Sequence, residues 1–194
     1  MIERLVDFFF PAQCAACNAA GSGLCERCVP LLPGCVRHRL KTIDVRALGE
    51  YRGAYRRSIL ALKDGRRDVA VALAERLASL VPSDSLLLPV PTTPARRRVR
   101  GMDNVRELAR LTALYSDARA FTALRRCGVD AQRGRSRTER LAARNRFACD
   151  GAMESHTYVL LDDVCTTGAT LEDCARVVRA AGGRIEEAVV VALA

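Results

Sequence analysis

The residues best suited to chemistry form one continuous stretch near the end of the chain, from Tyr158 to Thr170. An apolar run leads into two adjacent acids, Asp162 and Asp163, and then into a short, hydroxyl-rich turn that contains Gly168. The two carboxylates can accept hydrogen bonds from ribose hydroxyls, or hold Mg²⁺ through water. The turn can direct backbone N–H groups and threonine hydroxyls at one phosphate. The stretch therefore predicts a binding site for a ribose and a phosphate.

A strand, a tight turn and a helix are needed to hold these residues. Apolar side chains recur at helical spacing between residues 171 and 182, and the chain closes with an apolar strand at 185–193. Further strands are expected at 86–91 and 120–124, and a helix at 69–81. Asp103 is a suitable N-cap for another helix, whereas residues 51–63 alternate only weakly. Parallel sheets place ligands at the carboxyl ends of their strands, which is where the two acids fall. The alternative is an ordinary buried strand that ends in a turn.

Composition limits the class of protein without choosing a function. A chain of 194 residues with 49% hydrophobic residues suits one main domain, with room for a small appendage. Its net charge of +9 comes almost wholly from arginine, because Lys41 and Lys63 are the only lysines. This charge favours a polyanionic partner, either a pyrophosphate-bearing small molecule or nucleic acid, although a genome rich in G and C would also explain it. Lys63 itself fits a solvated lysine at a helix end better than a phosphate ligand.

No apolar run approaches the length that would span a bilayer. The run from Phe8 to Phe10 is too short for the core of a signal peptide, and it is flanked by Asp7 and Pro11. We therefore expect a cytoplasmic protein with no membrane partner.

Two Cys-x-x-Cys pairs near the start of the chain predict a metal site, made by Cys14, Cys17, Cys25 and Cys28. Four thiolates at this spacing favour one tetrahedral Zn²⁺, which would be structural because no coordination position stays open. Disulfides are the alternative, but nine cysteines without a secretory signal argue against them. Cys35 and His38 form a further pair that we expect to be incidental. The predicted organisation is a zinc knuckle over residues 1–45 and a main domain over 46–194.

Two other segments are rich in arginine. The first lies between a strand and a helix, where it is placed to meet a pyrophosphate; its residues are Arg96, Arg97, Arg98, Arg100 and Gly101. A solvated run of charge is an equally good interpretation of that segment. The second, between Arg125 and Arg146, is too hydrophilic for a core and predicts an active-site lid or a nucleic-acid-binding face. Its candidate site residues are Gln132, Arg137, Arg140 and Asn145. Scarcity of aromatic residues for base stacking lowers the nucleic-acid option.

The stretch from Tyr158 to Thr170 resembles the signature of class I phosphoribosyltransferases, which bind phosphoribosyl pyrophosphate (PRPP) there. The order of features along nearly the whole chain is also similar to the ComF family, which comprises competence protein F and its gluconate-utilisation relatives. The similar segments are Leu5 to Pro11, the cysteine pairs, Tyr51 to Lys63, Pro89-Val-Pro91, Arg100 to Val105, Gln132, and Arg140 to Phe147.

This resemblance implies an α/β fold of the class I phosphoribosyltransferase type, a mostly parallel twisted sheet flanked by helices, with a small four-cysteine zinc module at the N-terminus. It implies PRPP binding with Mg²⁺, in which Asp162 and Asp163 act on the ribose. The PRPP loop would comprise Asp162, Asp163, Val164, Cys165, Thr166, Thr167, Gly168, Ala169 and Thr170. The implied function is transfer of a phosphoribosyl group to an unidentified acceptor, with a link to DNA uptake and competence. The alternatives are a non-catalytic PRPP or nucleotide sensor, and an accessory protein that contacts single-stranded DNA or a competence or repair helicase.

Two departures from the family patterns bear on the mechanism. Asp103 and Asn104 stand where Asn and Gln are usual, so an anionic side chain enters the predicted pyrophosphate loop. Purine-salvage relatives carry a carboxylate general base where this chain has Thr166. An acceptor would therefore need to be a good nucleophile unaided, or be activated by another group. Cys165 has no visible partner base, so we expect it to fill volume and not to react.

Overall fold

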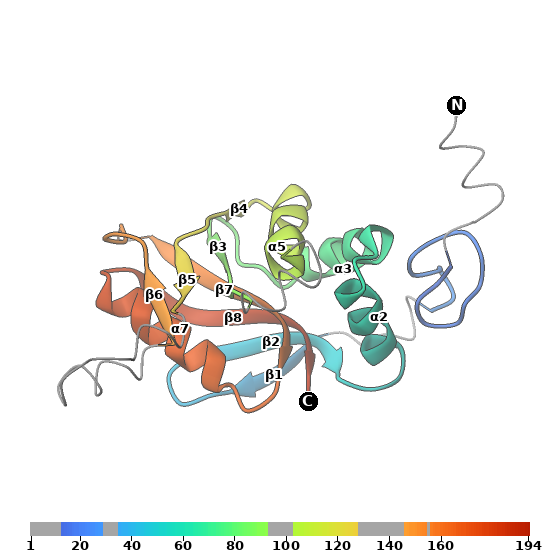
Figure 1. Cartoon of the computed structure of the whole chain (residues 1–194), viewed down its shortest axis with the longest axis horizontal. Helices are drawn as coiled ribbons and strands as arrows, with labels where there is room; N and C mark the ends of the chain where they lie inside the picture. Colours follow the sequence, from blue (N-terminus) through green and yellow to red (C-terminus); the bar gives the residue numbers. More distant parts are fainter. Residues whose placement is uncertain (1–12, 29–34, 93–102, 128–145, 155) are drawn as a thin grey trace.

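The computed structural model describes residues 13–28, 35–92, 103–127, 146–154 and 156–194. Its centre is a six-stranded sheet in the order β1-β2-β8-β7-β3-β4, and a separate two-stranded ribbon pairs β5 with β6. Only β1 runs antiparallel to its neighbour in the large sheet; every other pair there is parallel. The predicted α/β fold with a mostly parallel sheet is confirmed (Figure 1).

The bounds of the elements follow the chain. The strands are β1 (Val36–Arg39), β2 (Asp44–Glu50), β3 (Leu86–Pro89), β4 (Arg119–Ala120), β5 (Leu124–Arg126), β6 (Phe147–Cys149), β7 (Thr157–Cys165) and β8 (Arg184–Leu193). The helices are α2 (Gly53–Lys63), α3 (Arg67–Ala78), α5 (Asn104–Leu114) and α7 (Ala169–Ala180). Both β1 and the first residues of β2 precede residue 46, so the sheet already includes part of the chain before that position.

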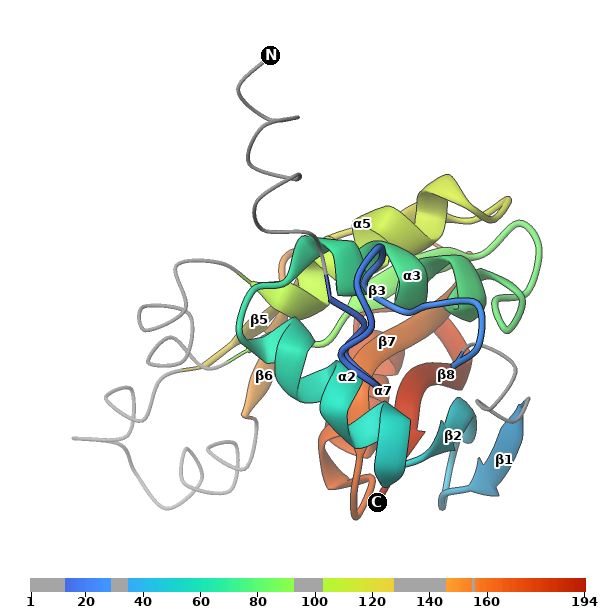
Figure 2. The same ribbon diagram turned by 90° about the vertical axis from the view of Figure 1, so that its right-hand side faces the viewer.

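Helices cover both faces of the sheet. Alternate residues of the central strand β8 point to opposite sides, so Val189 and Val191 join one buried cluster while Ala188 and Val190 join the other. The first cluster packs under α2, α3 and α5, and the second packs under α7 (Figures 1 and 2). A strand buried on both faces is almost wholly apolar, and this explains the apolar runs at 159–161 and 188–193.

Residues 51–63 differ from their weakly alternating sequence pattern, because most of this segment is helix α2. Its buried side chains include Tyr55, Ile59 and Leu62, at the i, i+4, i+7 spacing of a helix face. The expected strand at 120–124 is also divided: β4 ends at Ala120, and β5 begins at Leu124 in the separate ribbon. Asp103 caps α5 as predicted, because its side chain accepts a hydrogen bond of 3.2 Å from the backbone N–H of Arg106.

The cysteine-bearing segment packs against the main core. Cys14, Leu24 and Cys28 belong to the same buried cluster as Val69 and Leu73 of α3 (Figure 2). In addition, the guanidinium group of Arg66 donates a hydrogen bond to the backbone carbonyl of Gln13. Among the described helices, none combines the length and apolar character needed to cross a membrane.

Candidate functional site

The candidate site arises because two neighbouring strands end at different heights. Strand β3 pairs with β7 as far as Pro89, which lies opposite Leu161. Strand β7 continues to Cys165 alongside β8, so Asp162 and Asp163 lie beyond the end of β3. The carboxylates therefore sit at the carboxyl edge of the sheet with one flank open, where parallel sheets place their ligands.

A cavity of about 400 Å³ occupies this edge. Its wall combines residues that follow β2, β3 and β8 with the last residue of α2, the first residues of α5 and one residue of β5. From the predicted PRPP loop it includes Asp162, Asp163, Val164, Thr166 and Thr170. The other four loop residues are not part of the wall: Cys165, Thr167, Gly168 and Ala169. The cavity thus gathers both acids and two loop threonines in one space.

Another cavity, of about 560 Å³, lies at the opposite edge of the sheet. Leu86 and Tyr158, near the amino ends of β3 and β7, form part of its wall. Its charged groups include Glu154 and Arg119, and it contains neither the acid pair nor the hydroxyl-rich turn. Because ligands of parallel sheets bind at the carboxyl ends, we assign the candidate site to the first cavity.

The two acids have different environments. Asp162 accepts a hydrogen bond of 2.8 Å from the backbone N–H of Asp163. Burial, and then the negative charge of Asp163, raise the pKa of Asp162 well above its ordinary value. A cation or a hydrogen-bond donor supplied by a ligand would favour its ionised form. The pair is therefore suited to a ligand that brings hydroxyl groups or a metal ion.

Lys63 is the cation that faces the acid pair. Its Nζ lies 3.0 Å from Oδ2 of Asp163, and both side chains are mostly buried, with 24% and 18% of their surface exposed. The expectation of a solvated lysine was wrong, because the last turn of α2 ends at this edge of the sheet. The contact also shows that a positive charge fits beside Asp163.

Gly168 shapes the turn between β7 and α7. It is the N-cap of α7 and adopts a left-handed backbone with φ +74, a conformation that L side chains rarely adopt. An added Cβ would collide with the side chain of Leu40. The turn brings the first residues of α7 to the carboxyl edge, where Thr166 and Thr170 both line the cavity. Helix N-termini and threonine hydroxyls are good ligands for phosphate.

Cys165 is buried at the end of β7, with 2% of its surface exposed. Burial raises the pKa of its thiol, and the charge of Asp162 adds to this effect. A buried, protonated thiol is a poor nucleophile, in agreement with a role in packing.

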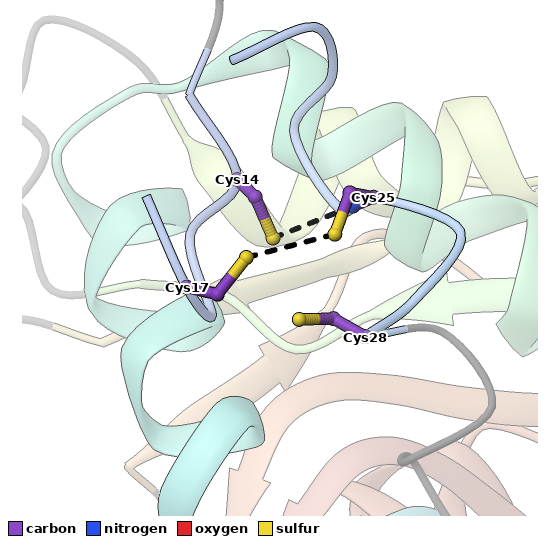
Figure 3. Close-up of side chains that lie close together, drawn as sticks. All are labelled: Cys14, Cys17, Cys25 and Cys28. Carbon is purple, nitrogen blue, oxygen red and sulfur yellow. Dashed lines mark hydrogen bonds between the residues drawn. The ribbon is translucent and has the colours of Figure 1, made fainter. Parts of the chain in front are cut away.

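The four predicted zinc ligands lie together (Figure 3). The sulfurs of Cys14, Cys17, Cys25 and Cys28 all lie within 4.8 Å of one another, and those of Cys17 and Cys25 are 3.6 Å apart. A Zn–S bond of about 2.3 Å sets the sulfurs of a tetrahedral site about 3.8 Å apart. The spacing therefore fits one zinc ion and is too long for a disulfide, and all nine cysteines are free.

The chemistry of the cluster also suits a bound cation. Burial raises the pKa of Cys14, but hydrogen bonds from the backbone N–H groups of Cys25 and Ala16 outweigh it and bring that pKa to about 6. The pKa of Cys28 is raised to about 12, chiefly by its hydrogen bond with Cys17. Four adjacent thiolates repel one another, and a divalent metal removes that repulsion. Within the described part of the chain, the metal-binding cluster includes neither Cys35 nor His38.

Two predicted segments lie wholly or mostly outside the described residues. They are the pyrophosphate loop (Arg96, Arg97, Arg98, Arg100 and Gly101) and the lid residues (Gln132, Arg137, Arg140 and Asn145). The ends of the expected lid are described and form the ribbon of β5 and β6. There Arg126 lines the cavity and stacks over the ring of Phe147, with its guanidinium carbon 5.2 Å from the ring centre.

Sequence reasoning missed part of the cavity wall. Tyr51, Lys63 and Asn104 were not among the predicted site residues, although all three line the cavity. A signal existed for Lys63, since a lysine is rare in this arginine-rich chain. Tyr51 gave none, because it reaches the site through the parallel pairing of β2 with β8.

Comparisons with known proteins give a likeness in structure and none in sequence. No protein-family model matches the chain, and no curated protein matches it. Among solved structures, the chain is similar to a purine phosphoribosyltransferase from Pyrococcus horikoshii Ot3, with 18% sequence identity and a TM-score of 0.35. The likeness covers 66% of this chain and 85% of that protein. The functional argument therefore rests on the residues of the cavity.

Proposed function

We propose that the cavity at the carboxyl edge of the sheet binds PRPP with Mg²⁺, and that the protein transfers the phosphoribosyl group to an acceptor. One observation carries this proposal: Asp162 and Asp163 share a cavity with Thr166 and Thr170 of the turn that begins α7. Paired acids suit the two hydroxyls of a ribose, and the turn suits its 5′-phosphate. The sequence resemblance to class I phosphoribosyltransferases supports the same assignment.

In the proposed reaction, pyrophosphate leaves the anomeric carbon of the ribose through a transition state with oxocarbenium character. The acids hold the ribose hydroxyls, and the turn holds the 5′-phosphate. Mg²⁺, held through water by Asp162 and Asp163, would neutralise charge on the departing pyrophosphate. Arg126 and Lys63 place further positive charge in the cavity wall, where it stabilises the same developing charge.

The resemblance to the ComF family leads us to propose a role in DNA uptake or competence, with a structural Zn²⁺ held by the four cysteines. The zinc module would stabilise the core beside α3 and take no part in the reaction, because four protein ligands leave no position for a substrate.

A non-catalytic PRPP or nucleotide sensor is the second candidate. Thr166 supports it, because it lines the cavity where purine-salvage relatives carry a carboxylate base. Among the described residues of the wall, the only carboxylate side chains are those of Asp162 and Asp163. The ribose would occupy both of them, which leaves the acceptor without an evident base.

Release of pyrophosphate separates the two candidates. Wild-type protein and Asp163→Asn are incubated with PRPP, Mg²⁺ and each of a set of nucleobases and amines, and pyrophosphate is measured over time. A transferase releases it with at least one acceptor, in the wild type and not in the variant. A protein that binds PRPP and never releases pyrophosphate is a sensor, and this outcome would refute the transferase.

A further inference from the structure

Asn104 is a buried polar side chain without a partner. It is the first residue of α5, has 7% of its surface exposed, and forms part of the cavity wall. Across the described residues, its Nδ2 is the one buried side-chain nitrogen or oxygen that makes no hydrogen bond. An unmet buried donor costs about 1–3 kcal/mol, so a protein rarely keeps one without a use.

The position of Asn104 fits a ligand contact. Rotation about the Cβ–Cγ bond of asparagine is soft, so the amide nitrogen can reach the cavity without movement of the backbone. Asn104 also lies at the N-terminus of α5, an 11-residue helix whose positive end favours negatively charged oxygens. A buried donor and a helix N-terminus in the same cavity wall point to an anionic ligand.

The charged groups around Asn104 agree with a phosphate-type oxygen. Asp103, the preceding residue, is negative, but its Oδ1 already accepts hydrogen bonds of 3.2 Å from Thr92 and from the backbone of Arg106. Arg126 and Lys63 contribute positive charge to the same cavity. Thr92 and Asn104 come from the connection between β3 and α5, whereas the turn proposed for the 5′-phosphate precedes α7. The two kinds of phosphate would therefore bind on different walls.

We propose that the side-chain amide of Asn104 donates a hydrogen bond to a pyrophosphate oxygen of PRPP. The inference rests on the proposed function, because it adds a specific ligand contact to the same site. It assigns the β3–α5 wall to the pyrophosphate and makes Asn104 a residue that distinguishes PRPP from ribose 5-phosphate. It also predicts that the residue lowers the stability of the ligand-free protein.

The test uses Asn104→Leu, which has nearly the same size and no donor. We expect its urea midpoint to equal or exceed that of the wild type, because the unmet donor is gone. By calorimetry its affinity for PRPP and for inorganic pyrophosphate should fall about tenfold or more, while affinity for ribose 5-phosphate stays within about twofold. Thr112→Val is the matched control on α5: Thr112 is buried but donates to the carbonyl of Leu108 at 2.8 Å, so this variant should lose stability and keep its affinities.

A lower urea midpoint for Asn104→Leu with unchanged pyrophosphate affinity would overturn the inference, as would an equal loss of affinity for ribose 5-phosphate. Failure of the proposed function looks different. Wild-type protein that binds pyrophosphate but not PRPP would refute PRPP as the ligand, and loss of that pyrophosphate binding in Asn104→Leu would still support the contact. Wild-type protein that binds neither would refute both.

Discussion

At the scale of the residue, the candidate site is built at the expense of local stability. Asp162 holds a carboxylate beside another carboxylate, Asn104 holds a donor without an acceptor, and Gly168 holds a left-handed backbone. Such features gather at functional sites because a ligand or a required geometry compensates for them. Each one makes a separate prediction about the ligand-free protein.

Gly168→Ala should lower the free energy of unfolding by about 2 kcal/mol or more, because the left-handed backbone and the collision with Leu40 both act against the new methyl group. Gly151 is the matched control: its φ is +90, but nothing lies within 4 Å of an added Cβ, so Gly151→Ala should cost about 1 kcal/mol. Urea unfolding measures both, and introducing Leu40→Ala should reduce the cost of Gly168→Ala to that of the control. Equal costs for the two single variants would contradict the close approach to Leu40.

Asp162→Asn should be more stable than the wild type at neutral pH. Burial and the charge of Asp163 raise the pKa of Asp162 in the folded state, so the wild type loses stability as pH rises from about 4, the unfolded value, through the folded pKa. Asparagine has no proton to lose, so the advantage of the variant should vanish towards pH 4 and be complete above the folded pKa. Urea midpoints from pH 4 to 8 measure the trend. Asp117→Asn, at an exposed carboxylate, controls for the change in net charge, and an Asp162→Asn variant less stable than the wild type at pH 8 would argue against the burial of this charge.

At the scale of the element, the strand–turn–helix around residues 158–180 could be predicted from sequence, whereas its partners could not. The acids, the turn and α7 are adjacent in the chain, so local pattern was sufficient to find them. Lys63 enters the site from α2, far earlier in the sequence, and only the packing of α2 beside the carboxyl edge brings it to Asp163. The buried face of α2 was missed because polar residues surround its three apolar anchors.

Lys63→Met should destabilise the ligand-free protein by about 1–2 kcal/mol, because it leaves the mostly buried carboxylate of Asp163 unpaired beside Asp162. Adding Asp163→Asn should recover most of that loss, so a double-mutant cycle in urea measures the coupling. Lys41→Met, at the other lysine and an exposed position, is the control and should change little. Additive effects of the two substitutions would show that the ion pair contributes nothing.

Cys14→Ser and Cys25→Ser should each reduce the zinc content from about one ion per chain to a small fraction, and should lower the melting temperature. The melting temperature falls because Leu24 and the cysteines pack with Val69 and Leu73 of α3, so a loosened knuckle exposes part of the main core. Elemental analysis and thermal unfolding measure the two effects. Cys35→Ser is the control, since Cys35 is exposed and lies outside the cluster. Unchanged zinc content in Cys14→Ser would count against the site.

At the scale of the whole molecule, the sequence pattern is sufficient for the fold class and for one wall of the site. The apolar runs of β7 and β8 indicate a parallel sheet, and its carboxyl edge then follows from the direction of the strands. The opposite wall is a property of the assembled fold: Tyr51, Asn104 and Arg126 come from three different elements and meet only when the sheet is complete. No spacing within any one of these elements indicates that they belong to the same cavity.

The most direct test of the central claim is a calorimetric titration of PRPP in the presence of Mg²⁺ into wild-type protein and Asp163→Asn. We predict saturable binding to about one site per chain in the wild type, and an affinity at least about tenfold lower in Asp163→Asn, which corresponds to about 1.4 kcal/mol. Asp117→Asn should bind as the wild type does, because its exposed carboxylate lies outside the cavity wall. Absence of binding by the wild type, or equal affinities of the wild type and Asp163→Asn, would contradict a PRPP site at the carboxyl edge of the sheet.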